Sequence, residues 1–174
     1  MPDVDPSKLA EEGKNAFGKK QFDQAADLFR RAADGYSLGH AGLLAAEMKN
    51  NLSVALLQAG KPREALEAAF GTEQIFAAAN DHKREAMAIG NQAAALEALK
   101  RYDEAIASYE KSASLFAEAD EGDMQAMVMK SAAALKLKTG KITESAFKMV
   151  GALEAKQKPT LFERIMKFFL RMRP

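Results

Sequence analysis

Three five-residue stretches at a regular spacing decide how this chain folds: Gln21-Phe22-Asp23-Gln24-Ala25, Lys61-Pro62-Arg63-Glu64-Ala65 and Arg101-Tyr102-Asp103-Glu104-Ala105. The interval from one stretch to the next is forty positions each time, so the second residue of each occupies one recurring position and the final alanine another. Ile142 and Ser145 hold the same two positions one interval further along the chain. A fixed period of this length indicates a repeat architecture, in which every repeat is one supersecondary unit.

The composition favours helices over sheets. Of 174 residues, 35 are alanine, the residue with the highest helix propensity, and only 13 are Val, Ile or Thr. That is too few β-branched side chains to cover the faces of a large sheet. We therefore expect an all-α fold. The expected helices lie near residues 6–19, 22–36, 41–59, 62–79, 82–99, 102–118, 122–139 and 142–155.

The three stretches resemble the turn between the two helices of a tetratricopeptide repeat (TPR), and the resemblance covers about residues 7–155. It implies a right-handed α-solenoid of four helix pairs, near 6–36, 41–79, 82–118 and 122–155, in which small residues such as Ala25 mark the helix crossings. The period exceeds the usual ~34 residues of this family, so the repeats look like the extended variety of kinesin light chains. We expect residues 156–174 to form a basic linker and a C-terminal amphipathic helix outside the repeats.

The resemblance also implies a concave wall, built from the first helix of each pair, that binds a peptide or helix of another protein. Asn51 and Asn91 hold the same position in successive repeats, and an amide can both donate to and accept from a peptide main chain. The alternative is that both amides satisfy neighbouring helix ends or water. The expected partner-binding residues are Lys14, Phe17, Glu47, Asn50, Asn51, Val54, Leu57, Met87, Asn91, Glu97 and Lys130.

One subclass of TPR proteins holds the acidic C-terminal tail of a chaperone in a clamp of lysine, arginine and asparagine side chains. The matching positions here are Ala10, Lys14, Asn51, Met87 and Asn91, of which only Asn51 carries the expected residue type. We therefore expect no binding of a chaperone tail. An amphipathic or basic peptide suits this mixed apolar, amide and acidic wall better.

The last residues of the chain differ from the rest in charge and pattern. Residues 156–174 contain six Lys or Arg and one acidic residue, a net charge of +5, whereas residues 1–155 carry −4. Thr160 and Glu163 have the spacing of a helix capping box. The apolar residues that follow cover roughly 200° of a helical wheel, more than the ~100° that packing on one neighbour requires.

Three interpretations of this segment stay open. It caps the last repeat, it lies at a membrane surface with its basic residues on anionic head groups, or it docks into a partner or a second copy. It is too short to span a bilayer. The interface residues in the second and third interpretations are Phe162, Ile165, Phe168, Phe169, Leu170 and Met172.

Catalytic and ligand-binding motifs are weak. There is no cysteine, and the two histidines, His40 and His82, fall in links between repeats, so we expect no metal site and no cofactor. The stretch from Gly13 to Lys20 follows part of a phosphate-binding loop but lacks the magnesium-binding Ser or Thr and a preceding strand. Basic residues do not alternate with aromatic ones, which argues against nucleic-acid binding. The sequence predicts a cytoplasmic, non-catalytic scaffold or adaptor; the alternative is an assembly factor held at a membrane surface by the C-terminal helix.

Overall fold

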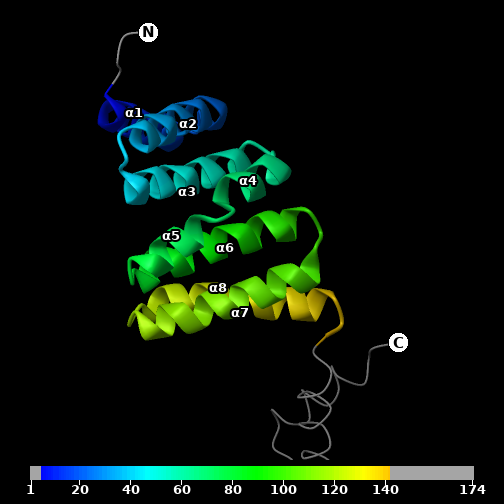
Figure 1. Ribbon diagram of the computed structural model, residues 1–174. Helices are drawn as coiled ribbons and strands as arrows, with labels where there is room; N and C mark the ends of the chain where they lie inside the picture. The colour runs from blue at the N-terminus through cyan, green and yellow to red at the C-terminus, as the bar shows by residue number, and fades with distance from the viewer. Residues whose placement is uncertain (1–4, 142–174) are drawn as a thin grey trace, which may run out of the picture. The chain divides into compact units, whose positions relative to one another are not determined.

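The structure is a computed structural model, and it describes residues 5–141 (Figure 1). The chain divides into two compact parts, residues 1–133 and 134–174, and each is considered by itself. Within the described residues every regular element is an α-helix, which confirms the predicted all-α class. The helices are α1 (Pro6–Gly18), α2 (Phe22–Leu38), α3 (Gly42–Gln58), α4 (Pro62–Ala69), α5 (Thr72–Ala78), α6 (His82–Ala98), α7 (Tyr102–Glu118) and α8 (Gly122–Lys138).

Capping aspartates and prolines stand at helix starts that the sequence predicted. The Asp5 carboxylate accepts a hydrogen bond from the Ser7 N–H (2.9 Å), and Asp81 accepts one from the Arg84 N–H (2.9 Å), so each caps the helix that follows. Pro6 and Pro62 each open a helix, where a missing N–H costs no hydrogen bond. Seven of the eight expected helices begin in the described residues, and six of these have both ends within two residues of the prediction.

A residue with left-handed backbone recurs at an even interval, twice in each repeat. At each such turn the next N–H donates to the carbonyl oxygen five residues back, at 2.9–3.0 Å. This pattern is the Schellman motif, which satisfies carbonyl groups at the end of a helix. A single helix with its turn therefore makes up half a repeat, and a hairpin makes up a whole one. The residues with positive φ at these turns are Lys20, His40, Gly60, Asn80, Lys100, Asp120 and Gly140.

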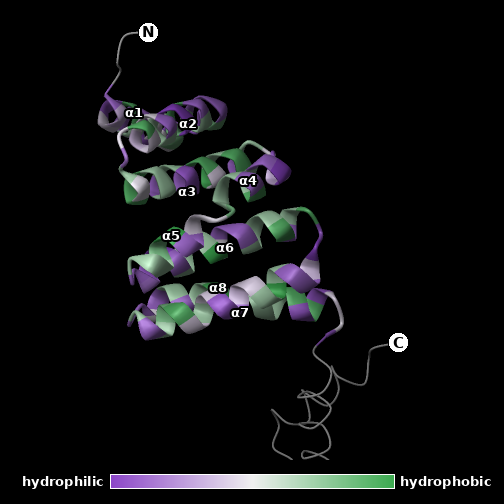
Figure 2. Cartoon of the chain, viewed as in Figure 1, coloured by the Kyte–Doolittle hydropathy of each residue, from purple (hydrophilic) through white to green (hydrophobic). Residues whose placement is uncertain are grey.

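Within residues 5–133 the helices form consecutive antiparallel hairpins (Figure 1). The first helices of successive pairs are α1, α3, α6 and α8, and each of the first three packs against the second helix of its own pair. Every helix carries both hydrophobic and hydrophilic residues (Figure 2). Small residues let the helices approach closely: the equivalent Ala25, Ala65 and Ala105 are fully buried. A Cβ atom on Gly13 of α1 would stand 2.8 Å from the Phe29 ring of α2.

The helix expected over residues 62–79 is broken, and this part of the prediction is wrong. Phe70 is extended (φ −62°, ψ 130°) and Gly71 is left-handed (φ +80°), so α4 ends and α5 begins in a new direction. Side chains satisfy the backbone at the break. The Ala69 carbonyl oxygen lies 2.7 Å from Thr72 Oγ1 and accepts a hydrogen bond from Gln92 Nε2 of α6 (3.1 Å).

The helix expected over residues 142–155, and with it the second half of the fourth pair, lies outside the described residues. The final turns of α8 and the left-handed Gly140 belong to the second part of the chain. Across the described range, 5–141, no helix combines the length and the apolar character needed to cross a membrane.

Candidate partner-binding surface

The expected partner-binding residues come from the first helix of each pair, and the structure gathers several of them around two hollows. The first hollow, of about 210 Å³, is lined by Lys14, Phe17, Phe29, Asn51 and Val54. The second, of about 220 Å³, is called the methionine hollow here. It is lined by Met87, Gly90, Asn91, Ala94, Tyr109, Phe116, Met124, Met127, Val128 and Ser131.

The first hollow lies between α1 and α3, with Phe29 of α2 buried beneath it. Phe17 is held edge-on against Phe22, with ring centroids 5.3 Å apart. Lys14 stands 4.0 Å from Glu11, and both side chains are more than half exposed. A surface pair of this kind contributes little to stability, so the ammonium group remains available to a ligand carboxylate.

The methionine hollow lies between α6 and α8, over α7. Its base is made of buried Tyr109, Phe116 and Val128, and its accessible rim includes Met87 (39 % exposed) and Met127 (56 % exposed). Asn91 and Ser131 add the polar groups. Methionine side chains are flexible and polarizable, so a rim built from them adapts to apolar side chains of different shapes.

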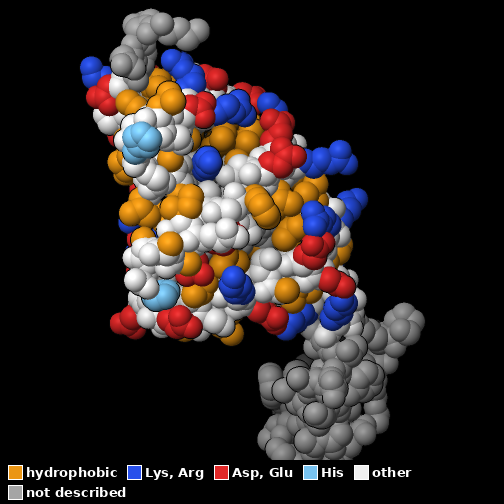
Figure 3. Space-filling view, viewed as in Figure 1, with side chains coloured by type: hydrophobic (Ala, Val, Ile, Leu, Met, Phe, Trp, Pro, Cys, Tyr) orange, Lys and Arg blue, Asp and Glu red, His pale blue; other side chains and the backbone are white. Residues whose placement is uncertain are grey.

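Asn51 and Asn91 occupy the same position in successive repeats, but the structure places one in each hollow. Both side chains are half-buried. Each of the two hollows therefore has one repeat-related amide in its lining. Figure 3 shows basic and acidic side chains interspersed over one face of the molecule, with apolar side chains surfacing between them.

Glu97 is engaged within the chain. The buried Tyr109 hydroxyl donates a hydrogen bond to its carboxylate (2.9 Å). Burial, with the nearby Glu97 carboxylate as a second cause, raises the pKa of Tyr109 well above its usual range. The tyrosine therefore stays protonated at neutral pH and keeps donating to Glu97. This carboxylate orients one wall of the methionine hollow and does not line it.

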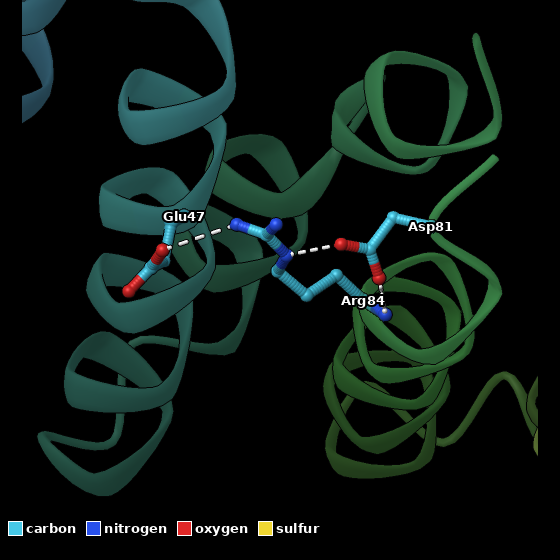
Figure 4. Close-up of polar contacts among 3 residues, drawn as sticks. All are labelled: Glu47, Asp81 and Arg84. Carbon is cyan, nitrogen blue, oxygen red and sulfur yellow. Dashed lines mark hydrogen bonds and ion pairs between the residues drawn. The ribbon is translucent and has the colours of Figure 1, made fainter. Parts of the chain in front are cut away.

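Glu47 also contacts another residue of this chain, in a cluster of charged side chains that joins α3 to α6 (Figure 4). Arg84 donates from Nε to Asp81 Oδ2 (2.6 Å) and lies 3.4 Å from Glu47 Oε2 through Nη1. Its guanidinium carbon stands 5.4 Å from the centre of the Phe76 ring, within cation–π range. The backbone N–H of Arg84, followed by its side chain, lowers the pKa of Asp81. The cluster links α3, which lines the first hollow, to α6, which lines the methionine hollow.

Asn50 does not belong to the surface, and its prediction as a partner-binding residue is wrong. Its side chain is only 8 % exposed, and its Oδ1 lies 3.0 Å from Thr72 Oγ1, the first residue after the helix break. In the repeat frame Asn50 corresponds to Ala10, which is buried, and to Gly90, where an added Cβ would stand 3.3 Å from Ser112 Oγ of α7. The amide supports the break between α4 and α5 from inside the fold.

Two further predicted residues lie outside both hollows. Leu57 is half-buried and packs against the core formed by α1 to α4 together with Ala95 of α6. Lys130 is exposed on α8 and corresponds in the repeat frame to Gly90, whose added Cβ would be 3.8 Å from Val128 of the following first helix. The predicted residues Phe162, Ile165, Phe168, Phe169, Leu170 and Met172 lie outside the described residues.

Three aromatic residues from second helices line the hollows although the prediction used first helices alone: Phe29, Tyr109 and Phe116. A signal was present, because Phe29 and Tyr109 share one position of the repeat. In the second repeat that position is Ala69, next to the helix break. A large ring at this position thus lines each of the two hollows.

Within residues 5–141 no three His, Cys, Asp or Glu side chains cluster as metal ligands would. His82 faces Glu85 through Nδ1 (3.6 Å), and His40 is exposed at a turn.

Comparison with known proteins supports the fold. A TPR-like protein from Chlorobium tepidum TLS superimposes with a TM-score of 0.61 at 20 % sequence identity, covering 76 % of this chain and 94 % of that one. No family model matches the sequence, and no curated protein matches it. At this identity the likeness concerns the fold alone: the chain is an all-α protein whose sequential helical hairpins are arranged like those of a TPR-like structure.

Proposed function

We propose that this chain is a non-catalytic scaffold or adaptor that binds a peptide or helix of a partner protein on the face formed by α1, α3, α6 and α8. The observation that carries the proposal is the pair of hollows on successive first helices, each with an apolar lining and a repeat-related amide, Asn51 or Asn91. Hollows of this size fit single apolar side chains, and the amides can pair with the main chain between them.

The chemistry of the lining also supports binding over catalysis. The hollows contain apolar side chains, amides, one aliphatic hydroxyl, one phenol and one ammonium group. They contain no carboxylate, imidazole or thiol that could serve as a base or nucleophile. A TPR-like arrangement of hairpins is in keeping with protein partners in general.

Selection from a displayed library of random peptides against the immobilised full chain tests the proposal. The double variant Asn51→Ala with Asn91→Ala is expected to weaken an enriched peptide by about tenfold or more, because two main-chain hydrogen bonds are lost. Fluorescence anisotropy with the synthetic peptide measures the dissociation constant.

Leu38→Glu is the matched control, since Leu38 is 83 % exposed on α2 and lines neither hollow. Binding to this variant should stay within about twofold of the parent chain. Thermal melts should show both variants folded. Enriched peptides that bind the double variant and the parent equally would remove this face from the proposal.

A further inference from the structure

The methionine hollow has room for an aromatic ring. Its volume of about 220 Å³ exceeds the ~150 Å³ of a cavity that holds benzene. None of its ten lining residues is charged, and three of them are methionines that can close around a ring. An occupant is therefore expected to bring a large apolar side chain, and its charged groups must lie outside the hollow.

Electrostatics distinguishes the two hollows. Residues 5–133 contain 15 Lys or Arg and 20 Asp or Glu, a net charge of −5. The first hollow nevertheless has Lys14 at its rim, which repels a basic segment. The charges next to the methionine hollow in the sequence have both signs: Glu97 follows Ala94 and Lys83 precedes Met87, each by about one helical turn, while Asp123 precedes Met124 and Lys130 precedes Ser131. Because none of the lining residues is a cation, the net negative charge of residues 5–133 is not opposed inside this hollow as it is at Lys14. A basic, apolar segment is therefore favoured at the methionine hollow.

The chain itself encodes a segment with this chemistry. Residues 160–172 lie outside the described residues and enter only through their sequence. They contain eight large apolar side chains, among them Phe162, Phe168 and Phe169, and belong to a stretch with a net charge of +5. The apolar surface of the predicted helix is wider than one packing contact covers.

We infer that residues 160–172 of one copy dock on a second copy, with an aromatic side chain in the methionine hollow of that copy. The inference rests on the proposed function because it uses part of the same face. The inference adds self-association of the chain, which competes with partner binding. At high protein concentration residues 160–172 of one copy occupy the methionine hollow of another, and a partner peptide must displace them. The first hollow stays open in both states.

Sedimentation velocity of the full chain, from about 1 μM to about 1 mM, tests the inference over the affinity range of modest interfaces. The parent chain should pass from monomer to a larger species as its concentration rises. Met127→Glu at the hollow and Phe168→Glu in the segment should each raise the midpoint concentration at least about tenfold, because a carboxylate replaces an apolar contact. Leu38→Glu should leave it within about twofold.

Mixing the two variants provides the decisive measurement. The Met127→Glu copy keeps an intact segment and the Phe168→Glu copy keeps an intact hollow, so the mixture should associate at concentrations where each alone is monomeric. Thermal melts confirm that each variant folds.

A chain that is monomeric throughout, or a Met127→Glu variant that associates like the parent, overturns the inference. So does a monomeric chain whose binding to anionic phospholipid vesicles is lost in Phe168→Glu, because the segment then belongs to a membrane surface. In each of these cases the library peptides still report separately on the proposed function.

Discussion

Asn50 and Asn51 are adjacent on α3 but face different surroundings. The Asn50 amide is buried against Thr72, whereas Asn51 lines the first hollow. Asn50→Ala is expected to destabilise the chain by about 1–3 kcal/mol, because a buried hydrogen bond and its packing are lost. Asn51→Ala should change the free energy of unfolding by less than about 0.5 kcal/mol while weakening peptide binding. Urea denaturation and anisotropy titrations measure the two effects.

Each of the two variants, Asn50→Ala and Asn51→Ala, serves as the control for the other in both the stability and the binding measurement. Asn50→Ala should retain peptide affinity under conditions where it remains folded. Equal stability losses in the two variants would contradict the division of roles.

The sequence contained part of this distinction. Successive residues of a helix are about 100° apart, so two neighbours rarely face the same surface. The positions equivalent to Asn50 are Ala10 and Gly90, whose small size indicates a crowded site between helix pairs. The sequence could not predict that Thr72 is the hydrogen-bond partner of Asn50, because the position of Thr72 depends on the helix break.

The broken second helix of the second pair depends on Gly71. An alanine there would meet no neighbouring atom within 4 Å, so space is available, but φ is +80°. Gly71→Ala should therefore cost about 1–2 kcal/mol through backbone strain alone. Chemical denaturation measures the loss, and hydrogen exchange at α4 and α5 locates it.

Gly42 provides the matched control at the start of α3. An added Cβ at Gly42 also meets no atom within 4 Å, and its backbone is helical. Gly42→Ala should be neutral or stabilising by up to about 1 kcal/mol. If both substitutions were tolerated alike, the left-handed conformation of Gly71 would not be required for stability.

Helix positions were largely predictable and helix continuity was not. The helix ends could be predicted from the repeat frame, from Pro62 and from the composition, because each repeat contains the same turn. The frame also predicted an unbroken helix over 62–79, because the corresponding α2 and α7 are unbroken. Whether a glycine inside a helical stretch adopts positive φ depends on tertiary partners, here Thr72 and Gln92, which bond the Ala69 carbonyl oxygen.

The stability of the whole molecule should depend on acidic pH through Asp81. The folded state lowers its pKa below the ordinary 3.8, so the unfolded chain binds the proton more readily. The stabilisation is present above about pH 4 and is lost as the pH falls through the lower, folded-state pKa. Urea midpoints should therefore decrease between pH 5 and pH 2 more steeply than in Asp81→Asn, which retains the cap but cannot titrate.

Asp34→Asn controls for a general change of surface charge, because Asp34 is exposed on α2. Its midpoints should follow those of the parent chain across the range. A parallel pH profile for Asp81→Asn and the parent would show that the contact with Arg84 does not couple folding to protons.

At the scale of the molecule, the repeat predicted the order of the hairpins and which helices form the candidate surface. It did not predict the two hollows, because their linings combine side chains from first and second helices. The aromatic bases of the hollows come from second helices and require the packing of three helices to be known.

The even spacing of the left-handed turns has a consequence for changes in chain length. Insertion of one residue into a helix rotates the following side chains by about 100° about the helix axis, and it shifts the next left-handed turn out of the regular spacing. Loss of half a repeat would bring two helices of the same type into succession. Loss or gain of a whole repeat rejoins the chain in phase, so duplication or deletion of complete hairpins is the length change that this architecture accommodates.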